Sequence, residues 1–425
     1  MRVLIKQVIW LLRQNPLMSA ITILGTGFAI CLLMVMCISW QIRYGPSAPE
    51  VNLDRTLYIS WLCLQGKEDT SINSVGHASP AFMKACIWPS EAVEASSAIS
   101  YITRPLLSVP GQPQRFSADY RSTDPAFWQI YRFDFIDGRP FSDADVYTDL
   151  IPVVVAESVA RRLFGRTDIA GERLLINRET AVVTGVVRDI SLTATHSYAQ
   201  IWGKYNPTYL EMPASEYDWL DGFDIAILAR SRGEMPRVRT DVNRMADQLS
   251  SSLATKNVKL FGQPDSHIQF MNRGGWGELD MKKFYMQYLL VVLIIFLVPA
   301  LNLSGLFSSR IRERLIEVGV RKAFGSTSRG LLRQVLGENL LLTCLGGVAG
   351  LLLSYGALFL FREWFFVTPE MLSSSGPLLL SVRALLHPLV FMMAFFFCLC
   401  MNLLSAWLPA WKVVKQPIVG CLNQK

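Results

Sequence analysis

Residues 308–340, "SSRIRERLIEVGVRKAFGSTSRGLLRQVLGENL", lie between two strongly apolar runs of a 425-residue chain. From Arg310 to Arg333 the stretch holds seven Arg or Lys residues and only two acids, Glu313 and Glu317. Positive charge at this density beside apolar runs is typical of the cytoplasmic loops of membrane proteins. The stretch therefore indicates an integral membrane protein and places this loop in the cytoplasm.

The composition supports a membrane protein, since 51% of the residues are hydrophobic and 18% are charged. A transmembrane helix needs about 20 consecutive apolar residues. The four predicted transmembrane helices are residues 17–40, 286–307, 331–361 and 389–411. The first is longer than a signal-peptide core and no cleavage-type sequence follows it, so we interpret it as an uncleaved anchor. Residues 41–283, between the first two, are long enough for a folded domain.

Basic residues near the predicted helices determine the expected orientation. The N-terminal segment, the basic loop and the C-terminal tail (412–425) hold three, seven and three of them, whereas the loop at 362–388 holds two. Both termini and the basic loop are thus expected in the cytoplasm, and residues 41–283 outside the bacterial inner membrane. The formal net charge of +7 follows from this topology, so nucleic-acid binding is not needed to explain it.

Ahead of the first transmembrane helix, residues 1–16 have apolar residues at helical spacing between basic ones. We predict an amphipathic helix in the cytoplasmic interface of the bilayer, and an extension of the transmembrane helix is the alternative. After it, Gly45 and Pro46 are expected to end the helical run.

Residues 41–283 mix strand and helix patterns. β-branched and aromatic runs predict strands, and apolar residues at helical spacing predict a helix over 236–254. The expected strands lie at 55–64, at 151–165 with a short helix that Gly165 ends, at 179–191 and at 217–230. This mixture predicts an α+β domain in two lobes.

No catalytic or metal-binding motif stands out. The chain lacks a G-x-x-x-x-G-K-[ST] phosphate loop, a G-x-S-x-G, an H-E-x-x-H and a C-x-x-C pair. Its four histidines have no ligand spacing, so we expect packing or surface roles and no metal site. They are His77, His196, His267 and His387. In "FSDADVYTD" (141–149), Ser142 and Asp145 favour a helix cap over a metal site.

The basic loop predicts a helical hairpin at 310–330. Apolar residues alternate with basic ones from Arg310 to Ala323, Gly325 is suited to end this helix, and residues 326–328 are suited to cap the next. The positive-inside rule needs fewer basic residues than this, so we interpret the hairpin as a contact surface for a cytoplasmic partner.

Residues 317–356, "EVGVRKAFGSTSRGLLRQVLGENLLLTCLGGVAGLLLSYG", resemble the signature of the MacB/FtsX-like ABC transporter permeases. The family pattern is roughly E-[IV]-G-[IV]-[RK]-[KR]-A-x-G-[AS], then an apolar helix with a glutamate and a glycine cluster. The matching residues are Glu317, Gly319, Arg321, Lys322, Ala323, Gly325, Glu338, Gly346, Gly347 and Gly350. The C-terminal "PAWKVVKQPIVGCL" (409–422) and "VVVAESVARRLFG" (153–165) are also similar to the family.

The resemblance implies a non-catalytic permease subunit in the lipid bilayer, working as a homodimer or heterodimer with a separate ABC-type ATPase. ATP would be bound by that partner, and the chain itself would need no cofactor. The residues implied in coupling to the ATPase are Glu317, Gly319, Arg321, Lys322, Ala323 and Gly325. In MacB-like members ATP hydrolysis moves the external domain (mechanotransmission), which suggests efflux or export with a periplasmic adaptor or outer-membrane channel. Glu338 is expected to face the ATPase, and a role in a substrate path through the membrane is the alternative.

Other functions remain open at this level. Within the family, the permease would instead release lipoproteins or regulate a cell-wall hydrolase. From a different class, it would be a membrane-anchored sensor or scaffold without ATP coupling. A secondary transporter fits poorly, because the predicted transmembrane helices hold few ionisable residues.

Small residues mark a packing face on the third predicted transmembrane helix. Gly346, Gly350 and Ser354 follow one another at i, i+4 and i+8, which permits close helix approach within one subunit or across a dimer. Cys63 and Cys86 both lie in the segment 41–283, so a disulfide between them is one possibility and two free thiols are the other.

Overall fold

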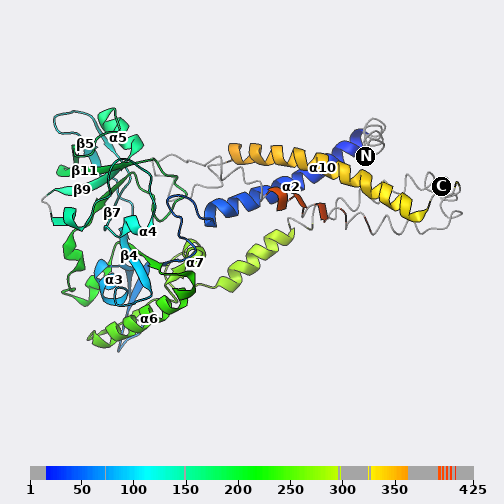
Figure 1. Cartoon of the computed structure of the whole chain (residues 1–425). Helices are drawn as coiled ribbons and strands as arrows, with labels where there is room; N and C mark the ends of the chain where they lie inside the picture. Colours follow the sequence, from blue (N-terminus) through cyan, green and yellow to red (C-terminus); the bar gives the residue numbers. More distant parts are fainter. Residues whose placement is uncertain are drawn as a thin grey trace. The chain divides into compact units, whose positions relative to one another are not determined.

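The computed structural model describes residues 16–71, 73–147, 150–294 and 327–361, with isolated positions at 297, 324 and between 391 and 407. These residues fall into two compact units. One is residues 43–281, here called the large domain. The other holds the rest of helix α2 (Pro16–Tyr44), a helix that begins at residue 281, and helix α10 (Ser328–Leu360), all drawn in Figure 1.

The first sheet of the large domain has the strand order β15-β2-β3-β14-β1-β16, with β13 on β3 and β4 on β14. All its strand pairs are antiparallel. Its strands are β1 (Thr56–Ile59), β2 (Trp61–Gly66), β3 (Asn73–Ala78), β4 (Val93–Ser100), β13 (Leu220–Asp221), β14 (Phe223–Ala229), β15 (Lys256–Lys259) and β16 (Asp265–Ser266).

The second sheet has the order β6-β5-β10-β11-β9-β12-β7, with β8 on β11. It is mixed, because β9 runs parallel to β11 and β7 runs parallel to β12. Its strands are β5 (Leu106–Ser108), β6 (Arg115–Ser117), β7 (Tyr120–Thr123), β8 (Phe135–Gly138), β9 (Ile151–Ala156), β10 (Arg173–Ile176), β11 (Glu179–Val187) and β12 (Ile201–Lys204).

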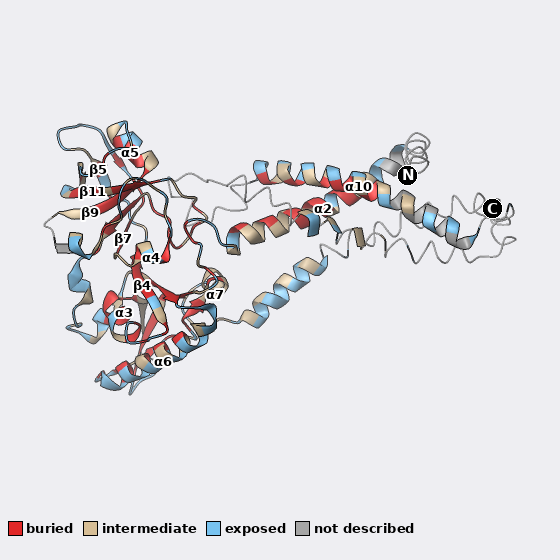
Figure 2. Cartoon of the chain, viewed as in Figure 1, coloured by how far each residue is buried: buried red, intermediate tan, exposed pale blue. Residues whose placement is uncertain are grey.

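Short helices cover the sheets and connect the strands (Figure 1). The α-helices are α3 (Pro80–Cys86), α4 (Phe127–Ile130), α5 (Glu157–Phe164), α6 (Met235–Ser252) and α7 (His267–Asn272). The 3-10 helices are η1 (Asp143–Tyr147), η2 (Pro207–Leu210), η3 (Glu216–Trp219) and η4 (Arg232–Glu234). Helix α6 buries one face and leaves the other in solvent, as its alternating colours in Figure 2 show.

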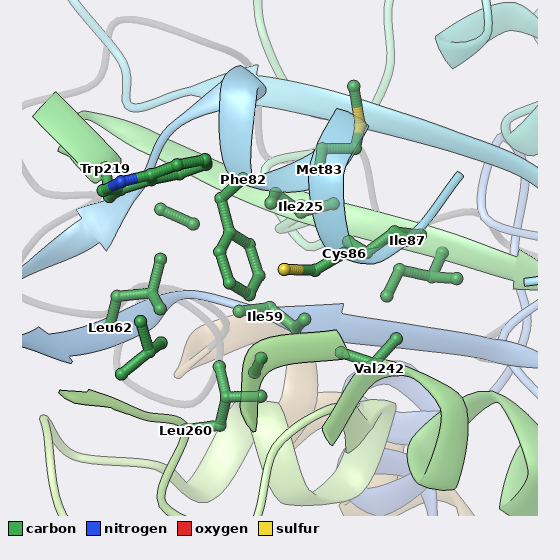
Figure 3. Close-up of a cluster of buried hydrophobic side chains, with 14 of the residues drawn as sticks. Ile59, Leu62, Phe82, Met83, Cys86, Ile87, Trp219, Ile225, Val242 and Leu260 are labelled. Carbon is green, nitrogen blue, oxygen red and sulfur yellow. The ribbon is translucent and has the colours of Figure 1, made fainter. Parts of the chain in front are cut away.

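Strand β14 contributes to two cores because its side chains alternate between the faces of the sheet. Ile225 packs with Phe82 of α3 and Val242 of α6 in the outer core (Figure 3). Leu228 instead packs with Trp202 of the second sheet in a middle core. A strand buried on both faces reads as a continuous apolar run, which explains "FDIAILA" at 223–229.

Strand β9 repeats this arrangement in the second sheet. Val153 and Val155 pack with Val159 of α5 in another outer core, while Val154 and Ala156 belong to the middle core. The large domain is therefore layered as helices, sheet, middle core, sheet and helix. Residues of the two sheets thus contribute to one shared core.

Several local predictions are confirmed. Gly165 ends α5 with a positive φ of 73°, a left-handed conformation that favours glycine. The backbone N–H and the hydroxyl of Ser142 both donate to Asp145 Oδ2, at 2.7 and 2.8 Å, where the chain turns into η1. The helix predicted over 236–254 is α6, and α2 ends at Tyr44, directly before Gly45.

One detail differs from the predictions, and one question that the sequence left open is answered. The expected strand at 55–64 is two strands, β1 and β2, separated at Ser60, whose N–H donates to the Gln263 side chain instead of continuing a ladder. Cys63 and Cys86 are both buried free thiols, so the disulfide is not formed.

Among the described residues, two helical segments are long and apolar enough to cross a membrane: residues 23–44 in α2 and 340–360 in α10. They correspond to the first and third predicted transmembrane helices. The second is described only as far as residue 294, apart from residue 297, and the fourth only at scattered positions, so the predicted total of four is not confirmed.

Candidate functional site where the chain enters and leaves the large domain

The chain enters the large domain at the end of α2 and leaves it after α7, and these two segments bind each other. The Tyr44 hydroxyl lies 3.2 Å from Asn272 Oδ1 and 3.1 Å from Asn272 Nδ2. Asn272 also donates to the Ile268 carbonyl at 2.7 Å, which holds its amide in place on α7. The segment that enters the domain and the segment that leaves it are thus joined by side-chain hydrogen bonds.

A second contact between the segments fixes the tautomer of a histidine. His267 Nε2 lies 3.1 Å from the carbonyl oxygen of Arg43. A carbonyl oxygen only accepts hydrogen bonds, so Nε2 carries the proton and the neutral ring keeps its lone pair on Nδ1. Burial lowers the pKa of His267, although the Arg43 carbonyl partly opposes this shift.

That lone pair meets another buried histidine. His196 Nε2 lies 3.1 Å from His267 Nδ1, so His196 Nε2–H is the donor. The His196 ring stacks on Tyr58 with centroids 3.7 Å apart and lies 4.3 Å from the Phe270 ring. Burial among these rings holds the pKa of His196 well below its ordinary value, and the neighbouring His267 and Arg121 lower it further.

Glu50 anchors the loop that carries His196, the segment between β11 and β12. Its Oε1 accepts the N–H groups of His196 and Ser197 and the Ser197 hydroxyl, each at 2.9 Å. Burial raises the pKa of Glu50, while these three hydrogen bonds and the Arg121 charge oppose the rise. Arg121 donates to the carbonyls of His196 and Thr195, at 3.3 and 3.1 Å.

A buried ion pair holds the chain just beyond α7. Arg273 contacts Asp265 through Nε at 2.5 Å and Nη2 at 3.0 Å, and both side chains are at most 4% exposed. Arg273 also donates to the Phe261 and Gly277 carbonyls. Burial raises the pKa of Asp265, and Arg273 opposes that rise. The exit segment is therefore fixed by directed polar contacts rather than by apolar packing alone.

In the helical unit, α2 and α10 approach each other through glycines. A Cβ at Gly350 would lie 2.6 Å from the Gly27 carbonyl oxygen, and a Cβ at Gly346 would lie 2.8 Å from Thr26 Cβ. Ser354, one turn beyond Gly350, is fully buried. The small-residue face predicted from the sequence lies against α2 of the same chain.

The six residues implied in ATPase coupling lie outside the described residues: Glu317, Gly319, Arg321, Lys322, Ala323 and Gly325. Sequence reasoning in turn missed Glu50, His196 and His267, which come together from three distant segments. Their spacing along the chain carries no ligand pattern, and only the fold makes them neighbours.

Comparison with known families accounts for both units. Residues 19–245 match the MacB-like periplasmic core domain, and residues 282–418 match the FtsX-like permease C-terminal domain. The first match alone covers more than half of the chain. The chain belongs to the MacB/FtsX-like family of ABC transporter permeases. The permease is thus a membrane protein whose large domain is a periplasmic core domain, as its sequence predicted.

Two curated relatives illustrate the similarity. The macrolide export ATP-binding/permease protein MacB of Chromobacterium violaceum is 24% identical over 254 residues, 60% of the permease and 37% of the relative. The uncharacterized ABC transporter permease YknZ of Bacillus subtilis is 21% identical over 295 residues, 68% of the permease and 69% of the relative. The permease therefore spans little more than a third of the length of the MacB relative.

Among solved structures, the permease is similar to the periplasmic region of MacB from Actinobacillus actinomycetemcomitans. The TM-score is 0.35 at 13% identity, covering 52% of the permease and 94% of that chain.

Proposed function

We propose that the permease couples ATP hydrolysis in a separate ABC-type ATPase to movement of its periplasmic domain, and that this movement drives export. In this scheme the permease supplies no catalytic residue and no cofactor, because ATP is bound by the ATPase. It is a multi-pass protein of the bacterial inner membrane with both termini in the cytoplasm. Two permease chains, identical or similar, form the dimer.

The observation that carries this proposal is the joining of entry and exit in the large domain. The Arg43 carbonyl binds His267, and the Tyr44 side chain binds Asn272. A shift of α2 or of the segment after α7 therefore reaches the domain at one place. Separate, unlinked connections would let the helices move without carrying the domain with them.

In this scheme the cytoplasmic end of the coupling is the basic segment 310–330, for which the sequence predicts a helical hairpin. Its charges suit an acidic docking surface, and the family signature there includes Arg321 and Lys322. A periplasmic adaptor or outer-membrane channel is the natural recipient of exported material. A relative named for macrolide export supports a small organic cargo over a protein.

A cavity in the large domain favours a second function, a membrane-anchored sensor that binds a ligand without ATP coupling. The cavity holds about 410 Å³ and is lined by Trp88, Asp124, Lys204 and Tyr205 among others. That volume suits a small molecule. A sensor of this kind would recruit a cytoplasmic partner without a nucleotide-dependent complex.

Co-purification of the full-length permease with its ATPase tests the proposal. We expect wild type to retain an ATPase whose hydrolysis rate rises on binding, and the double reversal Arg321→Glu and Lys322→Glu to lose both. Lys412→Glu and Lys415→Glu is the matched control, since it reverses two charges in the cytoplasmic tail. Retention of the ATPase by the hairpin variant would show that the hairpin does not dock it. A nucleotide-insensitive partner would favour the sensor.

A further inference from the structure

Glu50, His196 and His267 form the one group of three His, Cys, Asp or Glu side chains, within the described part of the chain, whose ligand atoms lie within 4.8 Å of one another. They come from the entry segment, the β11–β12 loop and α7. They are 3%, 4% and 5% exposed, so all three side chains are buried inside the domain. Two imidazoles and one carboxylate are the donor set that Zn²⁺ takes in many open sites.

The hydrogen bonds around His267 orient it as a ligand. Its Nε2–H is directed to the Arg43 carbonyl, so the Nδ1 lone pair faces His196. A metal-bound imidazole almost always donates its other N–H to a carbonyl or carboxylate, which fixes the ring and raises its basicity. Burial also favours the neutral imidazole, the form that binds a metal, in both histidines.

The spacing of the ring nitrogens fits one ion. Bonds of about 2.0–2.1 Å in a tetrahedral shell place two nitrogen ligands about 3.3 Å apart. His196 Nε2 and His267 Nδ1 are 3.1 Å apart. A carboxylate oxygen of Glu50 lies within 4.8 Å of a ring nitrogen of each histidine.

Charged groups of both signs lie around the cluster and act on a bound cation in opposite directions. The Arg121 guanidinium is nearby and repels it. Glu50, Asp119 and Asp224 all interact with Arg121 and offset its charge. The acidic side chains therefore compensate the positive charge of Arg121 near the proposed ion.

We propose that Glu50, His196 and His267 bind a transition-metal ion of the Zn²⁺ class, with water completing the shell. On binding, His196 changes tautomer: the proton leaves Nε2 and Nδ1 is protonated, so the ring stays neutral and the freed Nε2 lone pair replaces the N–H···N bond with a metal bond. Both histidines then share the ion, so the metal ties α7 to the β11–β12 loop and to the entry segment. Metal binding does not depend on ATP coupling.

Co²⁺ and Zn²⁺ binding to the full-length permease tests this site. The protein is purified with a tag free of histidine and stripped with a chelator. We expect one Co²⁺ per chain with the visible absorption of a tetrahedral site, displaced by Zn²⁺. His196→Gln and His267→Gln should each weaken binding by more than the about 10- to 100-fold typical of losing an outer-shell partner.

His77→Gln is the matched control, because His77 is a half-buried histidine of the same domain that is not one of the three ligands, and the variant leaves the charge of its partner Asp224 in place. It should bind Co²⁺ as wild type does. Equal binding by wild type and the two cluster variants would overturn the site, as would no binding by wild type. X-ray absorption of Zn²⁺-loaded wild type needs no variant: two imidazoles and oxygen support the site, and a sulfur shell overturns it.

Discussion

The Nε2 atom of His267 lies 3.1 Å from the carbonyl oxygen of Arg43, so the first turn of α7 is bonded to the last turn of α2. These residues are more than two hundred positions apart in the chain. This hydrogen bond thus joins the segment by which the chain enters the large domain to the segment by which it leaves.

The first prediction concerns the other contact between these two segments, the hydrogen bond between the Tyr44 hydroxyl and the Asn272 side chain. Tyr44→Phe removes the hydroxyl that Asn272 binds, leaving a part-buried amide with fewer partners. We expect a loss of about 1 kcal/mol in unfolding free energy and a lower yield of transport per ATP hydrolysed. Denaturant unfolding and a coupled transport assay measure the two effects. Tyr101→Phe, at an exposed tyrosine, is the control and should change neither.

The second prediction concerns the buried ion pair. Arg273→Met leaves the Asp265 carboxylate buried without its partner, which typically costs about 3–5 kcal/mol. Equilibrium unfolding monitored by tryptophan fluorescence measures the loss. Arg166→Met is the matched control, because the pairs of Arg166 with Asp168 and Glu172 are exposed and worth about 0–1 kcal/mol. Equal losses in the two variants would contradict the structural role of Arg273.

The third prediction is a pH dependence. His196 and His267 have folded-state pKa values below the ordinary value of about 6.5, so the unfolded chain binds protons more readily. Their contribution is complete above about pH 6.5 and falls as pH drops below it, by up to about 1.4 kcal/mol per pH unit for each histidine.

The difference between wild type and His196→Gln isolates this effect, because the buried Glu50 and Asp124 titrate in both proteins. Raised pKa values for those two acids give the opposite slope, since burial favours their protonated forms; Asp124 has a pKa of about 6. We expect the stability gap between wild type and the variant to narrow below about pH 6.5. A gap independent of pH between 7 and 5 would contradict the assignment of neutral histidines.

The fourth prediction concerns helix packing. Gly350→Ala places a Cβ 2.6 Å from the Gly27 carbonyl oxygen, and backbone cannot yield as a flexible side chain does. We expect α2 and α10 to separate locally and the detergent-solubilised permease to lose thermal stability. Gly356→Ala, on the same helix with no atom within 4 Å of its Cβ, should be neutral or stabilising by up to about 1 kcal/mol. Size-exclusion after heating compares the two variants.

Local structure was the part of the fold most accessible from the sequence. Gly165 ends α5 because only glycine enters the left-handed region freely, and Ser142 and Asp145 cap a turn through their own side chains. Such features depend on a few neighbouring residues, so pattern and spacing suffice. The signature at 317–356 also predicted the family of the whole chain, but it did so by resemblance to known proteins and not by physical reasoning.

The core and the polar cluster were not accessible in this way. Whether Leu228 faces α6 or the second sheet depends on pairings between strands more than a hundred residues apart. His196 and His267 stand 71 positions apart, and nothing in either local sequence indicates the other. Sequence reasoning treated both as isolated histidines because burial and proximity are properties of the fold.

The middle core gives the periplasmic domain a mechanical property. Since Trp202 and Leu228 belong to one buried core that both sheets share, the sheets cannot hinge against each other without exposing that core to water. We therefore expect both sheets to move as one body in any motion of the domain, with no hinge between them.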